Sequence, residues 1–160
     1  MTEVPHPARR TIMCAATLLG ATATLAACGN GESEAPVNTP APIPQPMGEG
    51  QAVLSAEQLP VLSRAQVAAK DPATGHDIGV LLFRKDEQTV LAYSNICTHQ
   101  GCAVGVKSPS KDDFYCACHG SHFEPDGGTA TAGPAMGALV RYGCAIEGPD
   151  IVVYIPVEDA

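Results

Sequence analysis

Two short segments, both rich in cysteine and histidine, decide how this chain folds. They read Cys97-Thr98-His99-Gln100-Gly101-Cys102 and Cys116-Ala117-Cys118-His119-Gly120-Ser121-His122-Phe123. Each segment brings two cysteines and at least one histidine to a common space if the two loops meet. Thiols and imidazoles are the ligands that proteins offer to zinc and to iron–sulfur clusters. The sequence therefore predicts a metal centre built between two loops.

Four of these residues form a complete ligand set, namely Cys97, His99, Cys116 and His119. Two thiolates and two imidazoles can hold a tetrahedral zinc ion. The same set can hold a two-iron cluster in which both cysteines bind one iron and both histidines bind the other. The ligand types leave both interpretations open, so the spacing has to decide between them.

The spacing, Cys-x-His followed by Cys-x-x-His, closely resembles that of the Rieske iron–sulfur proteins, especially those of cytochrome bc complexes (quinol:cytochrome c oxidoreductases). Gly133-Pro134-Ala135 is similar to the proline loop that covers the cluster in this family. The resemblance extends in plausible strand order from about residue 51 to residue 158. It implies one [2Fe–2S] cluster on an all-β fold, an antiparallel sandwich or partly open barrel with a small cluster-binding subdomain formed by two loops.

The resemblance also implies roles for individual residues beside the four ligands. Cys102 and Cys118 occupy the positions of a disulfide that ties the two cluster loops together in high-potential members. Ser121 stands where the family places a hydroxyl donor to a bridging sulfide. Phe123 stands where high-potential members carry a tyrosine, so we expect a reduction potential in the upper half of the Rieske range but below that of proteins with both hydroxyls.

The function implied by the resemblance is one-electron transfer, with quinol or cytochrome b on one side and a cytochrome c-like acceptor on the other. In this family the outer nitrogens of His99 and His119 face solvent and can donate to a bound quinol oxygen. Gln100 replaces the leucine common in quinol-oxidising members, which makes the rim less apolar. The alternative is a free-standing membrane-anchored lipoprotein that carries electrons for another exported oxidoreductase. We expect no catalysis from this chain alone.

The N-terminal residues read as an export signal. Arg9 and Arg10 precede an uncharged run, Ile12–Ala27, that is too short and too rich in Ala and Thr for a permanent membrane span. The run ends at Cys28, and the residues around it resemble a bacterial lipobox; the arginine pair resembles a twin-arginine signal. We therefore expect cleavage after residue 27, a lipid on Cys28 and a location on the extracytoplasmic face of the cell membrane.

The rest of the chain divides into a linker and a folded domain. Residues 28–50 form a Pro-rich linker, for which the proline spacing favours extended backbone. The Rieske domain is expected over residues 51–158, with a helical period of at most one or two turns around Arg64–Lys70. Its predicted strands are Gly79–Arg84, Thr89–Asn95, Phe114–Cys116, Leu139–Ile146 and Ile151–Ile155.

Composition limits the remaining possibilities. The formal net charge of −8 argues against nucleic acid as a partner, because phosphate binding needs clustered Lys and Arg. Sixteen glycines and 14 prolines favour short elements joined by turns. Cys144 has no role in the cluster scheme, and we expect it to be a small buried hydrophobic residue within a strand.

Overall fold

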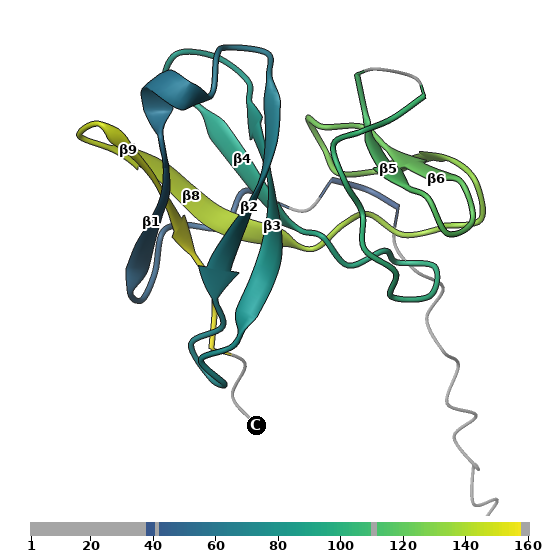
Figure 1. Cartoon of the computed structure of the whole chain (residues 1–160), viewed down its shortest axis with the longest axis horizontal. Coiled ribbons are helices and arrows are strands. Elements are labelled where there is room, and N and C mark those ends of the chain that lie inside the picture. The colour runs from purple at the N-terminus through teal and green to yellow at the C-terminus, as the bar shows by residue number, and fades with distance from the viewer. Residues whose placement is uncertain (1–37, 41, 110–111, 158–160) are drawn as a thin grey trace, which may run out of the picture. The chain divides into compact units, whose positions relative to one another are not determined.

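A computed structural model describes residues 38–40, 42–109 and 112–157, and these form two antiparallel sheets (Figure 1). The expected signal segment, residues 1–27, and Cys28 lie outside the described residues. Among the described residues, no helix is long and apolar enough to cross a bilayer. The all-β prediction is confirmed, since the one helical element in the described part of the chain is the short 3-10 turn η1 (Ala56–Gln58).

The larger sheet has six strands in the order β1-β9-β8-β4-β3-β2. Their bounds are β1 (Gly50–Ser55), β2 (Arg64–Lys70), β3 (Asp77–Arg84), β4 (Val90–Ser94), β8 (Arg141–Glu147) and β9 (Asp150–Tyr154). The strands predicted at Gly79–Arg84 and Thr89–Asn95 pair as the β3–β4 hairpin, and Asp86 closes its turn by accepting hydrogen bonds from the backbone N–H groups of Gln88 and Thr89. β8 and β9 form a second hairpin, which turns at Gly148 and Pro149.

A glutamine side chain joins the two edges of this sheet. Gln51 in β1 donates from Nε2 to the carbonyl of Lys70 in β2, and its Oε1 accepts from the Lys70 N–H, both at 2.7 Å. The side-chain amide of Gln51 thus offers one donor and one acceptor to Lys70, as the backbone of a neighbouring strand would, and it bridges the two edge strands. The sheet is therefore nearly closed, as the prediction of a partly open barrel requires.

The helical prediction around Arg64–Lys70 is wrong, because this segment is strand β2. Ala, Lys, Gln and Arg favour helix when considered alone. Here β2 pairs with β3 in continuous register from Arg64 opposite Phe83 to Lys70 opposite Asp77. Those tertiary hydrogen bonds and the burial of Ala69 outweigh the weak local preference.

The smaller sheet holds three strands in the order β5-β6-β7, and they carry the second cysteine segment. β5 (Phe114–Cys116) matches its prediction, whereas β6 (Ser121–Phe123) and β7 (Ala130–Ala132) were not predicted, as was also the case for β1. Three-residue strands leave too few alternating positions for a periodic signal in the sequence.

Alternating side chains of the large sheet pack into two different hydrophobic cores. Val80 and Leu82 in β3 enter a core inside the nearly closed sheet, together with Ile151 and Val153 of β9. The residue between them, Leu81, faces the other way. It joins a second core made with buried residues of the smaller sheet and its loops, namely Cys97, Val104, Phe114, Cys116, Phe123, Ala135 and Leu139. The second core therefore fixes the cysteine loops on one face of the large sheet.

Candidate metal centre

The two cysteine segments fold into loops of the same local design. In the first, the Gly101 N–H donates to the carbonyl of Cys97 at 2.8 Å; in the second, the Gly120 N–H donates to the carbonyl of Cys116 at 3.0 Å. Both glycines have positive φ angles, 74° and 76°. A residue with a Cβ would be strained in this left-handed conformation. The glycines therefore close each loop four residues after its first cysteine.

The loops bring two thiols together from opposite sides. Cys97 is 3% exposed and Cys116 is fully buried. Burial raises the pKa of the Cys116 thiol, and a hydrogen bond with the neighbouring Cys97 thiol raises it further. The backbone N–H groups of Cys118 and His119 oppose this shift by hydrogen bonding to the Cys116 sulfur. Such N–H donors stabilise negative charge on a cysteine ligand.

The loops also bring two imidazoles together. The ring centroids of His99 and His119 lie 4.8 Å apart, with the rings edge to face at 88°. His99 is half-buried, and its Nδ1 atom is buried without a hydrogen-bond partner among the described residues. His119 is exposed. Each of the two pairs, thiol with thiol and imidazole with imidazole, therefore takes one member from each loop.

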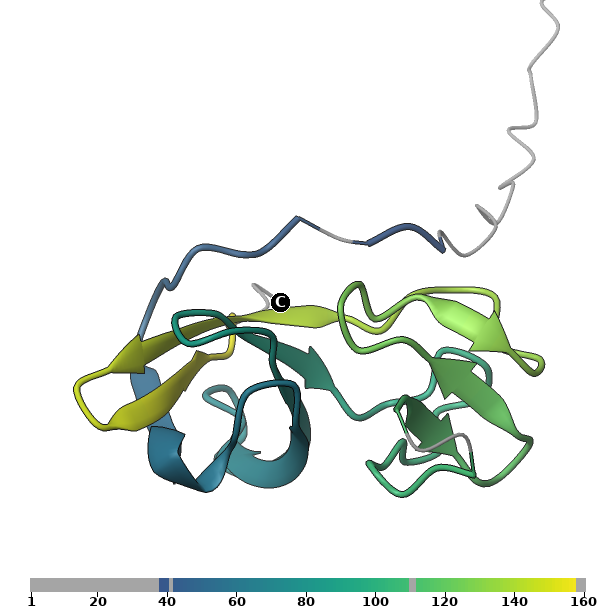
Figure 2. The ribbon, with the colours of Figure 1, turned by 90° about the horizontal axis from the view of Figure 1, so that it is seen from above.

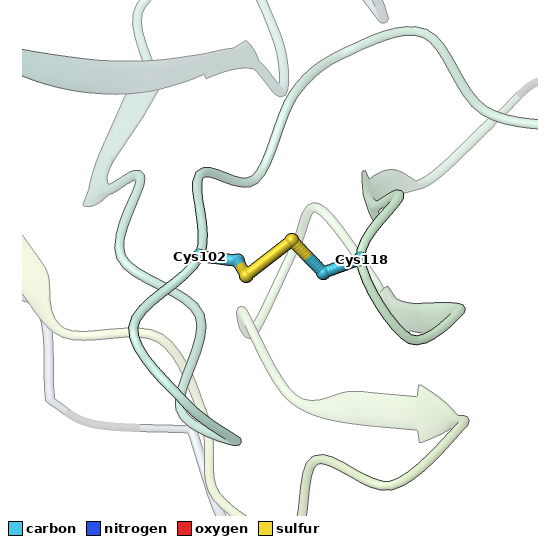
Figure 3. The surroundings of a disulfide bond; sticks show 2 residues. All are labelled: Cys102 and Cys118. Atoms are coloured by element: carbon cyan, nitrogen blue, oxygen red, sulfur yellow. A yellow bond between two sulfur atoms is a disulfide. The ribbon is translucent and has the colours of Figure 1, made fainter.

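A disulfide joins the loops directly. Cys102 of the first loop is bonded to Cys118 of the second, with 6.5 Å between their Cα atoms (Figure 3). The sulfur of Cys116 lies within 4.8 Å of both disulfide sulfurs. The pairing implied by the family resemblance is present, and it places a covalent cross-link beside the buried thiols.

A third loop, residues 133–137, is held against both cysteine loops. The Thr98 hydroxyl donates to the carbonyl of Gly137 at 2.6 Å, and the Ser121 hydroxyl accepts from the Ala135 N–H at 3.1 Å. Gly133 has a φ of 84°, and a Cβ there would lie 2.5 Å from the Ser121 Cα atom. The predicted proline loop thus packs on the second cysteine loop with no room for a side chain at Gly133.

Sequence reasoning missed the Thr98 contact because a threonine between two cluster residues gives no sign of its distant acceptor. It also gave no sign of the environment of His122. The His122 side chain is 19% exposed, and its Nδ1 lies 2.7 Å from Oδ2 of Asp113. β6 sets His122 opposite Tyr115 of β5, where their rings lie 4.8 Å apart. The cross-strand register therefore turns this histidine inward.

Comparison with known proteins agrees with this geometry. A sequence model of the Rieske [2Fe-2S] domain matches residues 52–143. The chain is 40% identical over 62 residues to the cytochrome bc1 complex Rieske iron-sulfur subunit of Streptomyces lividans, covering 37% of this chain and 36% of that protein. It is 35% identical over 60 residues to the menaquinol:cytochrome c reductase iron-sulfur subunit of Bacillus subtilis, covering 36% of each. The chain thus spans about a third of the length of these curated relatives.

A solved structure shares the fold. The ferredoxin of carbazole 1,9a-dioxygenase from Nocardioides aromaticivorans superimposes with a TM-score of 0.52 at 22% sequence identity, covering 68% of this chain and all of that one. At this identity the likeness concerns the fold alone.

The donor atoms present here fit the cluster of such a domain. The cluster needs two thiolates on one iron and two imidazole nitrogens on the other. The chain supplies a buried pair of thiols and a pair of imidazoles. Buried polar atoms normally have a hydrogen-bond partner, and the buried Nδ1 atom of His99 has none among the described residues. A [2Fe–2S] cluster would provide that missing partner.

Proposed function

This chain belongs to the Rieske [2Fe-2S] domain family, and we propose that it carries single electrons as the iron–sulfur subunit of a quinol:cytochrome c reductase chain of the cytochrome bc type. The proposal rests on the way the two cysteine loops meet, because Cys97 lies beside Cys116 and His99 lies beside His119. The curated relatives named above are iron–sulfur subunits of a cytochrome bc1 complex and of a menaquinol:cytochrome c reductase. That shared context favours a quinol as the electron source.

In this proposal Cys97 and Cys116 bind one iron of the cluster, and His99 and His119 bind the other. When bound, the cluster supplies a one-electron acceptor, at about −150 to +300 mV for Rieske centres. The buried thiols and the half-buried His99 exclude water from one side. The exposed ring of His119 leaves the other side open to a redox partner.

Hydrogen bonds from the chain tune the site. The backbone N–H groups at residues 118 and 119 donate to the Cys116 sulfur. The Ser121 hydroxyl accepts from Ala135 through a lone pair, so its proton is left for an acceptor such as a bridging sulfide. Each donor favours the more negative reduced state and therefore raises the reduction potential.

Exposed apolar side chains next to the loops suit docking against a membrane cytochrome. Ile96, which precedes Cys97, is 54% exposed, and Met136 of the third loop is 67% exposed. Val140 is 60% exposed, and its carbonyl accepts from the Ser94 N–H at the end of β4. An apolar rim around a redox centre lowers the cost of burying that surface against a partner.

We also propose that the protein is exported and anchored by a lipid on Cys28, which holds the domain at the extracytoplasmic face of the membrane. The support is the sequence pattern before Cys28. One relative is named as a subunit of a menaquinol:cytochrome c reductase, and an anchored carrier would meet such a quinol at the bilayer.

Detergent extraction tests the assignment. The protein, tagged at its C-terminus, is purified from its native membranes in mild detergent. We expect b-type haem to co-purify and a reduced quinol analogue to reduce the cluster within the complex. Purification without haem, together with no reduction by the quinol analogue, would contradict membership of a bc-type complex and favour a free-standing carrier.

A further inference from the structure

Three sulfur atoms lie together where the two cysteine loops meet, and only two of them are bonded to each other. The Sγ atoms of Cys102, Cys116 and Cys118 all lie within 4.8 Å of one another, and the bond joins Cys102 to Cys118. Figure 2 shows the two loops at the end of the molecule opposite the β8–β9 hairpin. Cys116 is therefore a free thiol placed next to a disulfide.

This arrangement is the starting geometry of thiol–disulfide exchange. A thiolate breaks a disulfide by attacking one of its sulfur atoms, and the other sulfur leaves as a thiolate. Cys116 has both disulfide sulfurs within a short displacement of its own. The Cys116 side chain is also fully buried, so reagents dissolved in water reach it poorly. The disulfide is thus an electrophile that is already within reach of Cys116.

The surroundings favour attack at the sulfur of Cys102. Attack at Cys118 would bond two cysteines of one loop that only Ala117 separates, and the narrow geometry of a disulfide makes so small a ring unfavourable. Attack at Cys102 bonds the two loops to each other, as the existing disulfide does. It also expels the sulfur of Cys118, an exposed residue, whereas Cys102 is half-buried. A leaving thiolate that water can hydrate leaves more readily.

We propose that the chain contains a built-in exchange in which Cys116 attacks the Cys102–Cys118 disulfide whenever no cluster holds Cys116. The Cys102–Cys116 bond forms and the Cys102–Cys118 bond breaks. The proton lost by the Cys116 thiol is balanced by the proton that the released Cys118 thiolate takes up. The number of disulfides does not change, so the step needs no oxidant or reductant. The proposal rests on the assignment of Cys116 as a cluster ligand.

The exchange turns the loss of the cluster into a covalent change of the site. Cys116 bonded to Cys102 cannot bind iron, so the site keeps only one of the two thiolates that a Rieske cluster needs. A bound cluster prevents the exchange because it occupies the Cys116 sulfur. The cluster therefore has to enter the chain before the disulfide forms, or while the disulfide is reduced.

Trapping of the released thiol tests the exchange in the full chain. The cluster is removed from the loaded protein with an iron chelator under anaerobic conditions, with iodoacetamide present throughout. Peptide mass spectrometry should then find alkylated Cys118 together with a Cys102–Cys116 disulfide. A Cys102–Cys118 disulfide that stays intact would overturn the proposal. A mixture of pairings that includes Cys144 would also overturn it, because such a mixture comes from an unfolded chain.

Two variants that each lack one of the buried thiols provide the matched control. Cys97→Ala keeps all three sulfur atoms and should give at least tenfold more alkylated Cys118 than Cys116→Ala, which lacks the attacking thiol. Both variants lose a cluster ligand, so neither releases cluster sulfide that could itself attack the disulfide. Equal alkylation of Cys118 in the two variants would overturn the role of Cys116 as the attacking group.

The loaded protein tests the protection by the cluster. In the same incubation without chelator, Cys118 should stay unalkylated and the Cys102–Cys118 disulfide intact. Alkylation of Cys118 as fast as in the chelator-treated protein would overturn the protective role. The measurement uses no electron donor or acceptor, so a failure of the proposed quinol:cytochrome c role would leave its result unchanged.

Discussion

The hydroxyl of Tyr93 in β4 accepts a hydrogen bond from Nη2 of Arg141 in β8 at 2.9 Å. The same hydroxyl lies 2.8 Å from the carbonyl of Pro125 and 2.9 Å from that of Asp126, to which it donates. Arg141 also donates to the Asp126 carbonyl at 2.6 Å, and its guanidinium lies 5.2 Å from the Tyr93 ring centroid. One buried tyrosine thus connects the large sheet to the loop that leads into β7.

Replacing Tyr93 by phenylalanine should lower the free energy of unfolding by about 1–2 kcal/mol, because two carbonyls in a partly buried site lose a donor. Burial raises the pKa of Tyr93 to about 12, so the hydroxyl stays a donor at neutral pH. Its contribution is complete below pH 10 and is lost as the pH rises toward 12. Denaturant unfolding at pH 7 measures the effect, with Tyr154→Phe, a more exposed phenol, as a control that should lose less. Equal losses for both variants would contradict the connecting role of Tyr93.

Phe123→Tyr should raise the reduction potential. Phe123 is fully buried in the same core as Cys97 and Cys116, so a hydroxyl there would lie near the sulfur ligands. A hydrogen bond that favours the reduced state by about 1.4 kcal/mol corresponds to about 60 mV for one electron. Ser121→Ala should shift the potential in the opposite direction. Redox titration measures both, and an unchanged or lower potential in Phe123→Tyr would refute the tuning argument.

Removing the disulfide should weaken both the fold and the hold on the cluster. The cross-link closes a loop with a sequence separation of 16 residues, for which the loss is about 3 kcal/mol. The double variant Cys102→Ser/Cys118→Ser should melt at a lower temperature and release iron to a chelator several-fold faster. Cys144→Ser controls for the loss of a cysteine elsewhere. Iron release at the wild-type rate would show that the cross-link does not hold the loops.

Cys144 should react slowly with alkylating reagents. It lies partly buried in β8 against the core of the large sheet, and burial raises its pKa to about 12. Alkylation at pH 8 should therefore be at least about a hundredfold slower in the folded protein than in denaturant. The stability linked to the neutral thiol is complete below pH 9 and is lost as the pH rises toward 12. Similar rates in the folded and unfolded protein would contradict this.

The two cluster loops could be predicted from the sequence because the ligands of each loop lie within a few residues of one another. Two short motifs contain the four ligands Cys97, His99, Cys116 and His119. Once both loops bind the same cluster, each like pair of ligands has to take one residue from each loop. The β3–β4 hairpin was also predictable, since a polar turn separates two apolar runs. These features depend on residues close together in the chain.

What the sequence could not reveal depends on distant partners. β2 looked helical because its pairing with β3 is tertiary. The proline spacing of residues 28–50 indicated extended backbone, but nothing local pairs Asn38 with Ala130. Tyr93 and Arg141 likewise meet only after the sheets form. The resemblance supplied the disulfide between Cys102 and Cys118, which cysteine counting alone left open.

The central claim is that two thiols and two imidazoles from these loops hold a single two-iron cluster. Electron paramagnetic resonance of the dithionite-reduced protein, with iron and acid-labile sulfide counted on the same sample, tests it most directly. We predict two irons and two sulfides per chain and a paramagnetic signal that appears only on reduction. A colourless protein that contains zinc and gives no signal would contradict the account.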